Sequence, residues 1–144
     1  MICISNNVTS KKILATICAL CTLVSMVIQA LIAFGAPLGE FVLGGIYIVA
    51  PLSRRIIHIF FAVLWGVVIY AYLSYGKIIF SKIDMKVVKG LVVLNTIFTS
   101  FAIIWNFFLT NSMKETVLMG PLTIIVSICS ILLILNKPII KERL

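Results

Sequence analysis

The chain has 144 residues, of which 62% are hydrophobic and only 11% are charged, and its net charge is +8. This composition excludes an ordinary water-soluble domain, in which about a quarter of the residues are charged. All sixteen charged residues lie outside four apolar stretches of 21 to 24 residues. The basic residues are therefore placed to meet lipid headgroups, and nucleic-acid binding is not expected.

The four uncharged stretches predict four membrane-spanning helices. They are Ile13–Phe34, Ile56–Gly76, Gly90–Met113 and Thr116–Asn136. A helix rises about 1.5 Å per residue, so about twenty residues cross the hydrocarbon core of a bilayer. We expect an all-α, four-helix transmembrane bundle that forms a single integral membrane domain over residues 1–144. The predicted helix bounds are 12–34, 56–76, 86–110 and 113–136.

The first apolar stretch follows Lys11 and Lys12, as the core of a secretory signal peptide would. It is too long for that role, so we expect an uncleaved first helix. Within it, Cys18 and Cys21 have the spacing of a redox motif. Membrane redox enzymes with such a pair also need cysteines in an external loop, which this chain lacks, so the sequence favours packing for both thiols.

The connection 35–55 is interrupted repeatedly by glycine and proline. Its uncharged part, 41–53, is too short to span a bilayer. Irregular backbone near a membrane must be buried in protein or face water. We therefore expect this external loop to fold back over the mouth of the bundle.

A candidate interface cluster surrounds this loop, consisting of Glu40, Arg54, Arg55 and His58. In the simpler interpretation, Glu40 pairs with an arginine and pins the loop. In the alternative, the four side chains form a polar ligand site. Because His58 is the single histidine of the chain, a multi-histidine metal site is not expected. We predict no metal, no cofactor and no catalytic residue.

The two later connections carry helix-start signals. Asp84, in the predicted cytoplasmic loop 77–85, is placed to cap the third helix. Ser112 and Glu115 have the spacing of a capping box, in which each side chain bonds the backbone N–H of the other residue. None of the four acids is expected inside the hydrocarbon region, which argues against a proton-coupled exporter.

Polar residues recur at helical spacing inside the spans and predict a shared intramembrane seam. Its members are Gln29, Asn95, Thr99, Asn106, Thr123 and Ser127. Membrane helices pack through small and polar residues, so helix packing is the favoured interpretation. The alternative is a polar pocket or path, because an unpaired amide in hydrocarbon is costly.

The basic residues also predict the orientation. Nine of them flank the ends that would share a side with both termini, and three flank the other ends. The side with more Lys and Arg is usually cytoplasmic, so both termini are expected in the cytoplasm.

The loop residues form a pattern of Gly35-Ala36-Pro37-x-Gly39, Glu40-Phe41, Gly44-Gly45, Pro51 and Arg54. This pattern resembles the external loop of an uncharacterised family of small bacterial four-span integral membrane proteins. Further along the chain, Asn106, Ser112, Glu115 and Pro121 resemble a second pattern of the same group. This chain has Val42-Leu43 where members often carry a tryptophan or a basic residue. The resemblance implies a multi-pass protein of the bacterial plasma membrane and implies no activity.

Three functions are compatible with the sequence. The first is a non-enzymatic accessory or structural membrane component. The second is a small homo-oligomeric transporter of a hydrophobic or amphipathic compound. The third is a lipid-modifying enzyme at the external interface that uses Glu40 and His58 as acid and base. Membrane lipid is the expected partner, with a second copy of the chain or another membrane protein as open alternatives.

Overall fold

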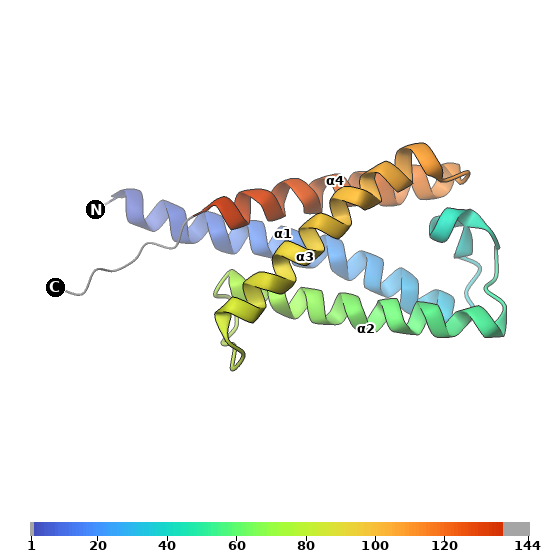
Figure 1. Cartoon of the computed structure of the whole chain (residues 1–144), viewed down its shortest axis with the longest axis horizontal. Helices are drawn as coiled ribbons and strands as arrows, with labels where there is room; N and C mark the ends of the chain where they lie inside the picture. The colour runs from blue at the N-terminus through green and yellow to red at the C-terminus, as the bar shows by residue number, and fades with distance from the viewer. Residues whose placement is uncertain (1, 137–144) are drawn as a thin grey trace.

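The computed structural model describes residues 2–136, with side chains described from residue 8 onward. Four long helices make up most of this part: α1 (Ile2–Ala33), α2 (Leu52–Tyr75), α3 (Met85–Ile104) and α4 (Met113–Leu135) (Figure 1). Each is long and apolar enough to cross a membrane. The protein is an all-α, four-helix transmembrane bundle, as the sequence predicted.

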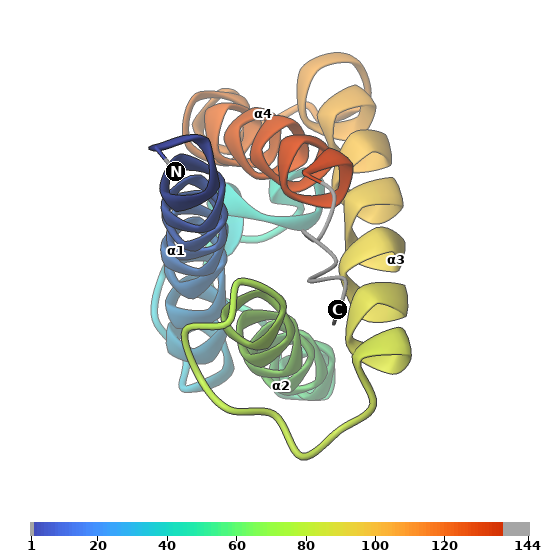
Figure 2. The same cartoon turned by 90° about the vertical axis from the view of Figure 1, so that its left-hand side faces the viewer.

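The helices stand around the bundle in chain order, so that α1 and α3 lie diagonally opposite (Figure 2). We call the end with the connections 34–51 and 110–112 the loop end. The opposite end, with the connection 76–84, is the terminal end, where α1 begins and α4 finishes (Figure 1). Toward the loop end, α3 leans away from α2 (Figure 1).

Two helices begin before their apolar stretches. α1 starts at Ile2, whereas the sequence predicted residue 12, and α2 starts at Leu52, whereas the sequence predicted residue 56. Ahead of α2, Pro51 is extended, and its carbonyl accepts the first helical hydrogen bond from the Arg54 N–H at 2.8 Å. An apolar stretch marks the part of a helix that lies in hydrocarbon and does not set its ends, so both helices continue past it.

The third helix ends in a π-helical turn, η3 (Trp105–Leu109). The Thr110 N–H reaches back five residues to the Trp105 carbonyl at 2.9 Å. A π turn widens the helix and changes which side chains share a face, and such turns are frequent at functional sites.

A buried hydrogen-bond network joins all four helices on the terminal side of the bundle. Asn95 Nδ2 donates to the Tyr72 hydroxyl at 2.7 Å, and that hydroxyl lies 2.5 Å from Ser130 Oγ. Cys18 Sγ lies 3.7 Å from the same serine oxygen. All four side chains are buried, so this network fixes the register of the four helices.

The loop between α1 and α2 is folded and carries two short 3₁₀ turns, η1 (Gly39–Phe41) and η2 (Leu43–Gly45). Seen end on, it lies across the far end of the bundle, between α1 and α4 (Figure 2). The Gly39 N–H donates to the Ile48 carbonyl at 2.9 Å. A Cβ at Gly39 would overlap the Tyr47 carbonyl oxygen, so the fold of the loop requires glycine there.

Candidate intramembrane binding site

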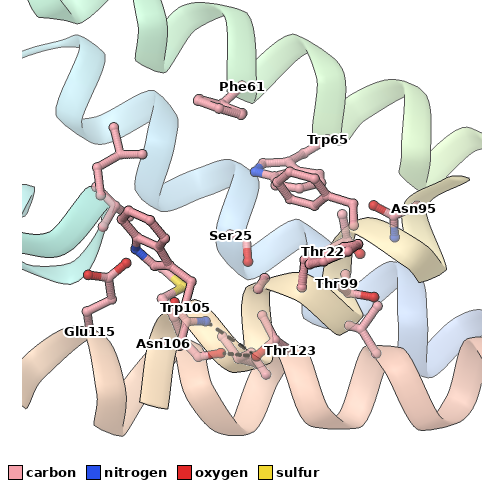
Figure 3. A pocket seen from close by; sticks show the side chains of 18 of the residues that line it. Thr22, Ser25, Phe61, Trp65, Asn95, Thr99, Trp105, Asn106, Glu115 and Thr123 are labelled. Carbon is pink, nitrogen blue, oxygen red and sulfur yellow. Dashed lines mark hydrogen bonds between the residues drawn. The ribbon is translucent and has the colours of Figure 1, made fainter. Parts of the chain in front are cut away.

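A cavity of about 500 Å³ lies between the helices in the loop half of the bundle (Figure 3). Five of the six predicted seam residues line it: Gln29, Asn95, Thr99, Asn106 and Thr123. The sixth, Ser127, is not part of the lining, and its hydroxyl lies 3.0 Å from that of Ser100 on α3. The polar seam therefore faces a cavity over most of its length.

Aromatic side chains also line the cavity. They are Phe61, Trp65, Phe98, Phe101 and Trp105, from α2, α3 and η3. Sequence reasoning did not select these residues, because aromatic side chains in an apolar span look like ordinary lipid-facing or core positions. Their spacing of three or four residues within each helix is the one signal that places them on a common face.

The cavity reaches the lipid-facing surface along α3. Phe98, Phe101 and Trp105 line it and are also 47%, 69% and 47% exposed. At the loop end, Val42 and Leu43 of the loop line the cavity. An occupant would therefore enter sideways, from the membrane, past the leaning helix α3 (Figure 1).

Glu115, in the first turn of α4, is an acid at the loop end of this cavity and is only 3% exposed (Figure 3). Its Oε2 accepts the Gly44 N–H at 2.7 Å and the Thr110 hydroxyl at 2.6 Å. Glu115 is therefore an acid buried within the protein, which the apolar stretches did not indicate. The apolar stretches could not indicate this burial, because the folded loop covers the carboxylate and the lengths of the spans do not predict how the loop folds.

The predicted capping box forms only by half. Ser112 Oγ accepts the Glu115 N–H at 3.3 Å, as expected. The Glu115 carboxylate does not return the bond, and the Ser112 N–H donates to Thr110 Oγ1 at 3.2 Å instead. The carboxylate instead accepts from the loop backbone at Gly44 and from the Thr110 hydroxyl.

Glu40 forms an ion pair with Lys114 at the start of α4, so the expectation of an arginine partner is wrong. Ser112 Oγ also donates to the Glu40 carbonyl at 2.5 Å. The Lys114 and Glu40 side chains are 57% and 32% exposed, so the ion pair contributes at most about 1 kcal/mol. The loop is pinned to α4, mainly through its backbone.

The two arginines have separate positions. Arg54 is exposed on the first turn of α2. Arg55 donates from Nε to the Ala50 carbonyl at 3.2 Å, and its guanidinium packs against Gly35, where a Cβ would lie 2.9 Å from Nη2. Arg55 thus braces the end of α1 against the start of α2.

His58 is fully buried and is bound on both ring nitrogens. Nδ1 lies 2.6 Å from Gln29 Oε1 on α1, and Nε2 lies 2.7 Å from the Tyr47 hydroxyl in the loop. With Gln29 accepting at Oε1, Nδ1 carries the proton and Nε2 accepts from tyrosine. Burial raises the pKa of Tyr47, so its hydroxyl keeps the proton that it donates.

The structure therefore does not bring Glu40, Arg54, Arg55 and His58 together in one interface site. Glu40 contacts α4, Arg55 braces the loop base, and His58 lies inside the bundle. Among residues 8–136, no three His, Cys, Asp or Glu side chains are grouped as metal ligands would be.

Comparison with protein-family models, with curated proteins and with solved structures finds no match to this chain. The cavity and the residues around it are therefore the basis for a functional interpretation.

Proposed function

We propose that this protein binds an amphipathic molecule that enters the cavity sideways from the membrane. The observation that carries the proposal is the cavity of about 500 Å³, with polar side chains and aromatic rings in its lining and a lipid-facing opening along α3. Small-molecule sites have volumes of about 300–1,000 Å³ and combine apolar walls with a few placed polar groups. This function favours the carrier or transporter alternative over a purely structural component.

The polar and the aromatic side chains of the lining suit the two parts of such a molecule. Asn106 Nδ2 makes a single long hydrogen bond of 3.4 Å to Thr123 Oγ1 (Figure 3), so its amide has capacity for a polar ligand group. Trp65 Nε1 is buried and has no hydrogen-bond partner within the described residues. This nitrogen is covered from the cavity as well, so a ligand meets the ring of Trp65 and not its N–H.

The groups suggested for surface catalysis are already occupied. Both nitrogens of His58 are hydrogen-bonded inside the bundle, and the Glu40 carboxylate is paired with Lys114. These contacts favour structural roles for both residues. We therefore propose binding and assign no reaction to the site.

We further propose that the chain lies in a bacterial plasma membrane with both termini in the cytoplasm, so that the loop end faces outside. The excess of Lys and Arg beside the terminal end supports this orientation. Reporter fusions after Gly76 and at Leu144 should report cytoplasm, and a fusion at Ile46 should report the outside. The reverse pattern would contradict the proposed orientation.

Thermal unfolding in mild detergent tests the binding proposal. A panel of single-chain amphiphiles and phospholipids is added to the full chain, and a binder present at 100 times its Kd should stabilise the fold by about 2.7 kcal/mol. Ala102 lines the cavity, so Ala102→Phe adds a ring to its wall and should abolish the stabilisation. Val63→Phe adds the same ring at an exposed position of α2 outside the lining and should retain it. Equal responses of the two variants would contradict the proposal.

A further inference from the structure

We infer that the occupant of this cavity carries a positively charged head group, which Glu115 holds at the loop end. The inference rests on the proposed binding function and specifies its ligand class, a cationic amphiphile. Three features of the described residues support it: an acid without a cationic partner, a lining without basic residues, and aromatic rings in the same cavity.

Glu115 is a buried acid whose charge has no partner in the described part of the protein. Oε2 receives its two hydrogen bonds from neutral groups, the Gly44 N–H and the Thr110 hydroxyl. Lys114, its neighbour in sequence, is paired with Glu40, and that is the one ion pair among residues 8–136. Buried acids are rarely left unpaired, so a cationic group is the complement that this site lacks.

The remainder of the lining contains no lysine, arginine or histidine. A phosphate, sulfate or carboxylate head group would therefore meet no counter-charge and would lie beside Glu115. Coulomb repulsion is only weakly screened in such a site. The cavity should thus reject anionic head groups as well as favour cationic ones.

Trp105 lines the same cavity as Glu115 (Figure 3). The face of an indole ring attracts a cation, and ammonium groups are bound in this way by aromatic side chains. The tail of the ligand would continue past Phe101 toward the lipid-facing opening. A positive head group and an apolar chain therefore match the two ends of the cavity.

The two tryptophans provide a direct readout, because the chain has only Trp65 and Trp105 and both line the cavity. We would reconstitute the full chain in phosphatidylcholine vesicles and titrate three probes with the same bromine-tipped twelve-carbon tail. The head groups are trimethylammonium, hydroxyl and sulfate, and bromine quenches tryptophan fluorescence on contact. Quenching in Ala102→Phe measures the background from probe dissolved in the bilayer, and the saturable excess in the wild-type protein measures occupancy of the cavity.

The wild-type protein should bind the trimethylammonium probe about tenfold more tightly than the hydroxyl probe, and the sulfate probe most weakly. Glu115→Gln retains an oxygen for Gly44 and Thr110, so it should remove the cation preference and bring the affinity for the trimethylammonium probe close to that for the hydroxyl probe. Glu40→Gln is the matched control, because it neutralises an acid outside the cavity lining, and it should retain the preference.

The outcomes separate the two proposals. Saturable binding without a cation preference in the wild-type protein would overturn the inference and leave the binding function standing. The same holds if Glu115→Gln keeps the full preference. If no probe gives saturable quenching, the binding function itself fails. The comparison of the three head groups on the wild-type protein decides the matter even if Glu115→Gln does not fold.

Discussion

The Glu115 carboxylate accepts a hydrogen bond from the backbone N–H of Gly44 at 2.7 Å, across 71 positions of sequence. This bond joins the start of α4 to the loop between α1 and α2. Gly44 has φ +80°, a left-handed conformation that favours glycine. In this conformation the Gly44 N–H points to the Glu115 carboxylate. One side chain thus both closes the cavity and faces into it.

Glu115→Ala should loosen the loop. Removal of the carboxylate leaves the Gly44 N–H and the Thr110 hydroxyl, both partly buried, without their acceptor, and each lost hydrogen bond costs about 0.5–1.5 kcal/mol. Equilibrium unfolding in mixed micelles should show this loss. Glu115→Gln keeps an oxygen acceptor and should keep most of the stability. Equal losses in the two variants would contradict the conclusion that the side chain of residue 115 holds the loop through these hydrogen bonds.

Gly39→Ala should disturb the fold of the same loop from within. Its Cβ would overlap the Tyr47 carbonyl oxygen, which belongs to backbone and cannot rotate away. Limited proteolysis should then cut within residues 39–50, which resist cleavage in the wild-type protein. Gly90→Ala is the control, because nothing lies within 4 Å of a Cβ there. That helical substitution should stabilise the protein by about 0.5–1 kcal/mol.

His58 should couple energetically to Tyr47. Their hydrogen bond is buried on the histidine side, and the two rings meet edge to face with centroids 5.9 Å apart. A double-mutant cycle with Tyr47→Phe and His58→Ala should give an interaction energy of about 0.5–3 kcal/mol. Additive losses would show that the loop is held to α2 by other contacts.

The Tyr47 bond should also depend on pH. Burial raises the pKa of Tyr47 above its ordinary value of 10.0, so the folded state favours the protonated phenol. The contribution of this hydroxyl should be complete below about pH 10 and decline as pH rises toward the raised pKa. The stability difference between wild type and Tyr47→Phe, measured from pH 7 to 11, isolates this effect from lysine titration. A constant difference over that range would contradict the assignment.

The fold followed from sequence because hydrocarbon excludes charge so strongly. Four stretches without Asp, Glu, Lys or Arg predicted the four helices, and each is present. Helical spacing likewise predicted that Gln29, Asn95 and Asn106 share an interior face. It could not distinguish packing from a cavity, since the difference depends on how far α3 leans from α2.

The contacts of the loop were beyond sequence reasoning for a different reason. Glu40 and Lys114 are 74 positions apart, and nothing local distinguishes this lysine from Arg54 as a partner. The S-x-x-E spacing at Ser112 indicated a cap within one helix, whereas the Glu115 side chain serves a neighbouring loop. A local motif predicts hydrogen bonds between residues close in sequence. It does not predict that the Glu115 carboxylate accepts from a loop that is distant in sequence.

Native mass spectrometry tests the central claim, an amphipathic molecule bound inside the bundle, most directly. The full chain and its Ala102→Phe and Val63→Phe variants would be extracted in mild detergent and compared. The account predicts a stoichiometric bound molecule of lipid or amphiphile mass on the wild-type protein and on Val63→Phe, and its loss from Ala102→Phe. Equal retention by all three proteins, or no bound molecule on any of them, would contradict it.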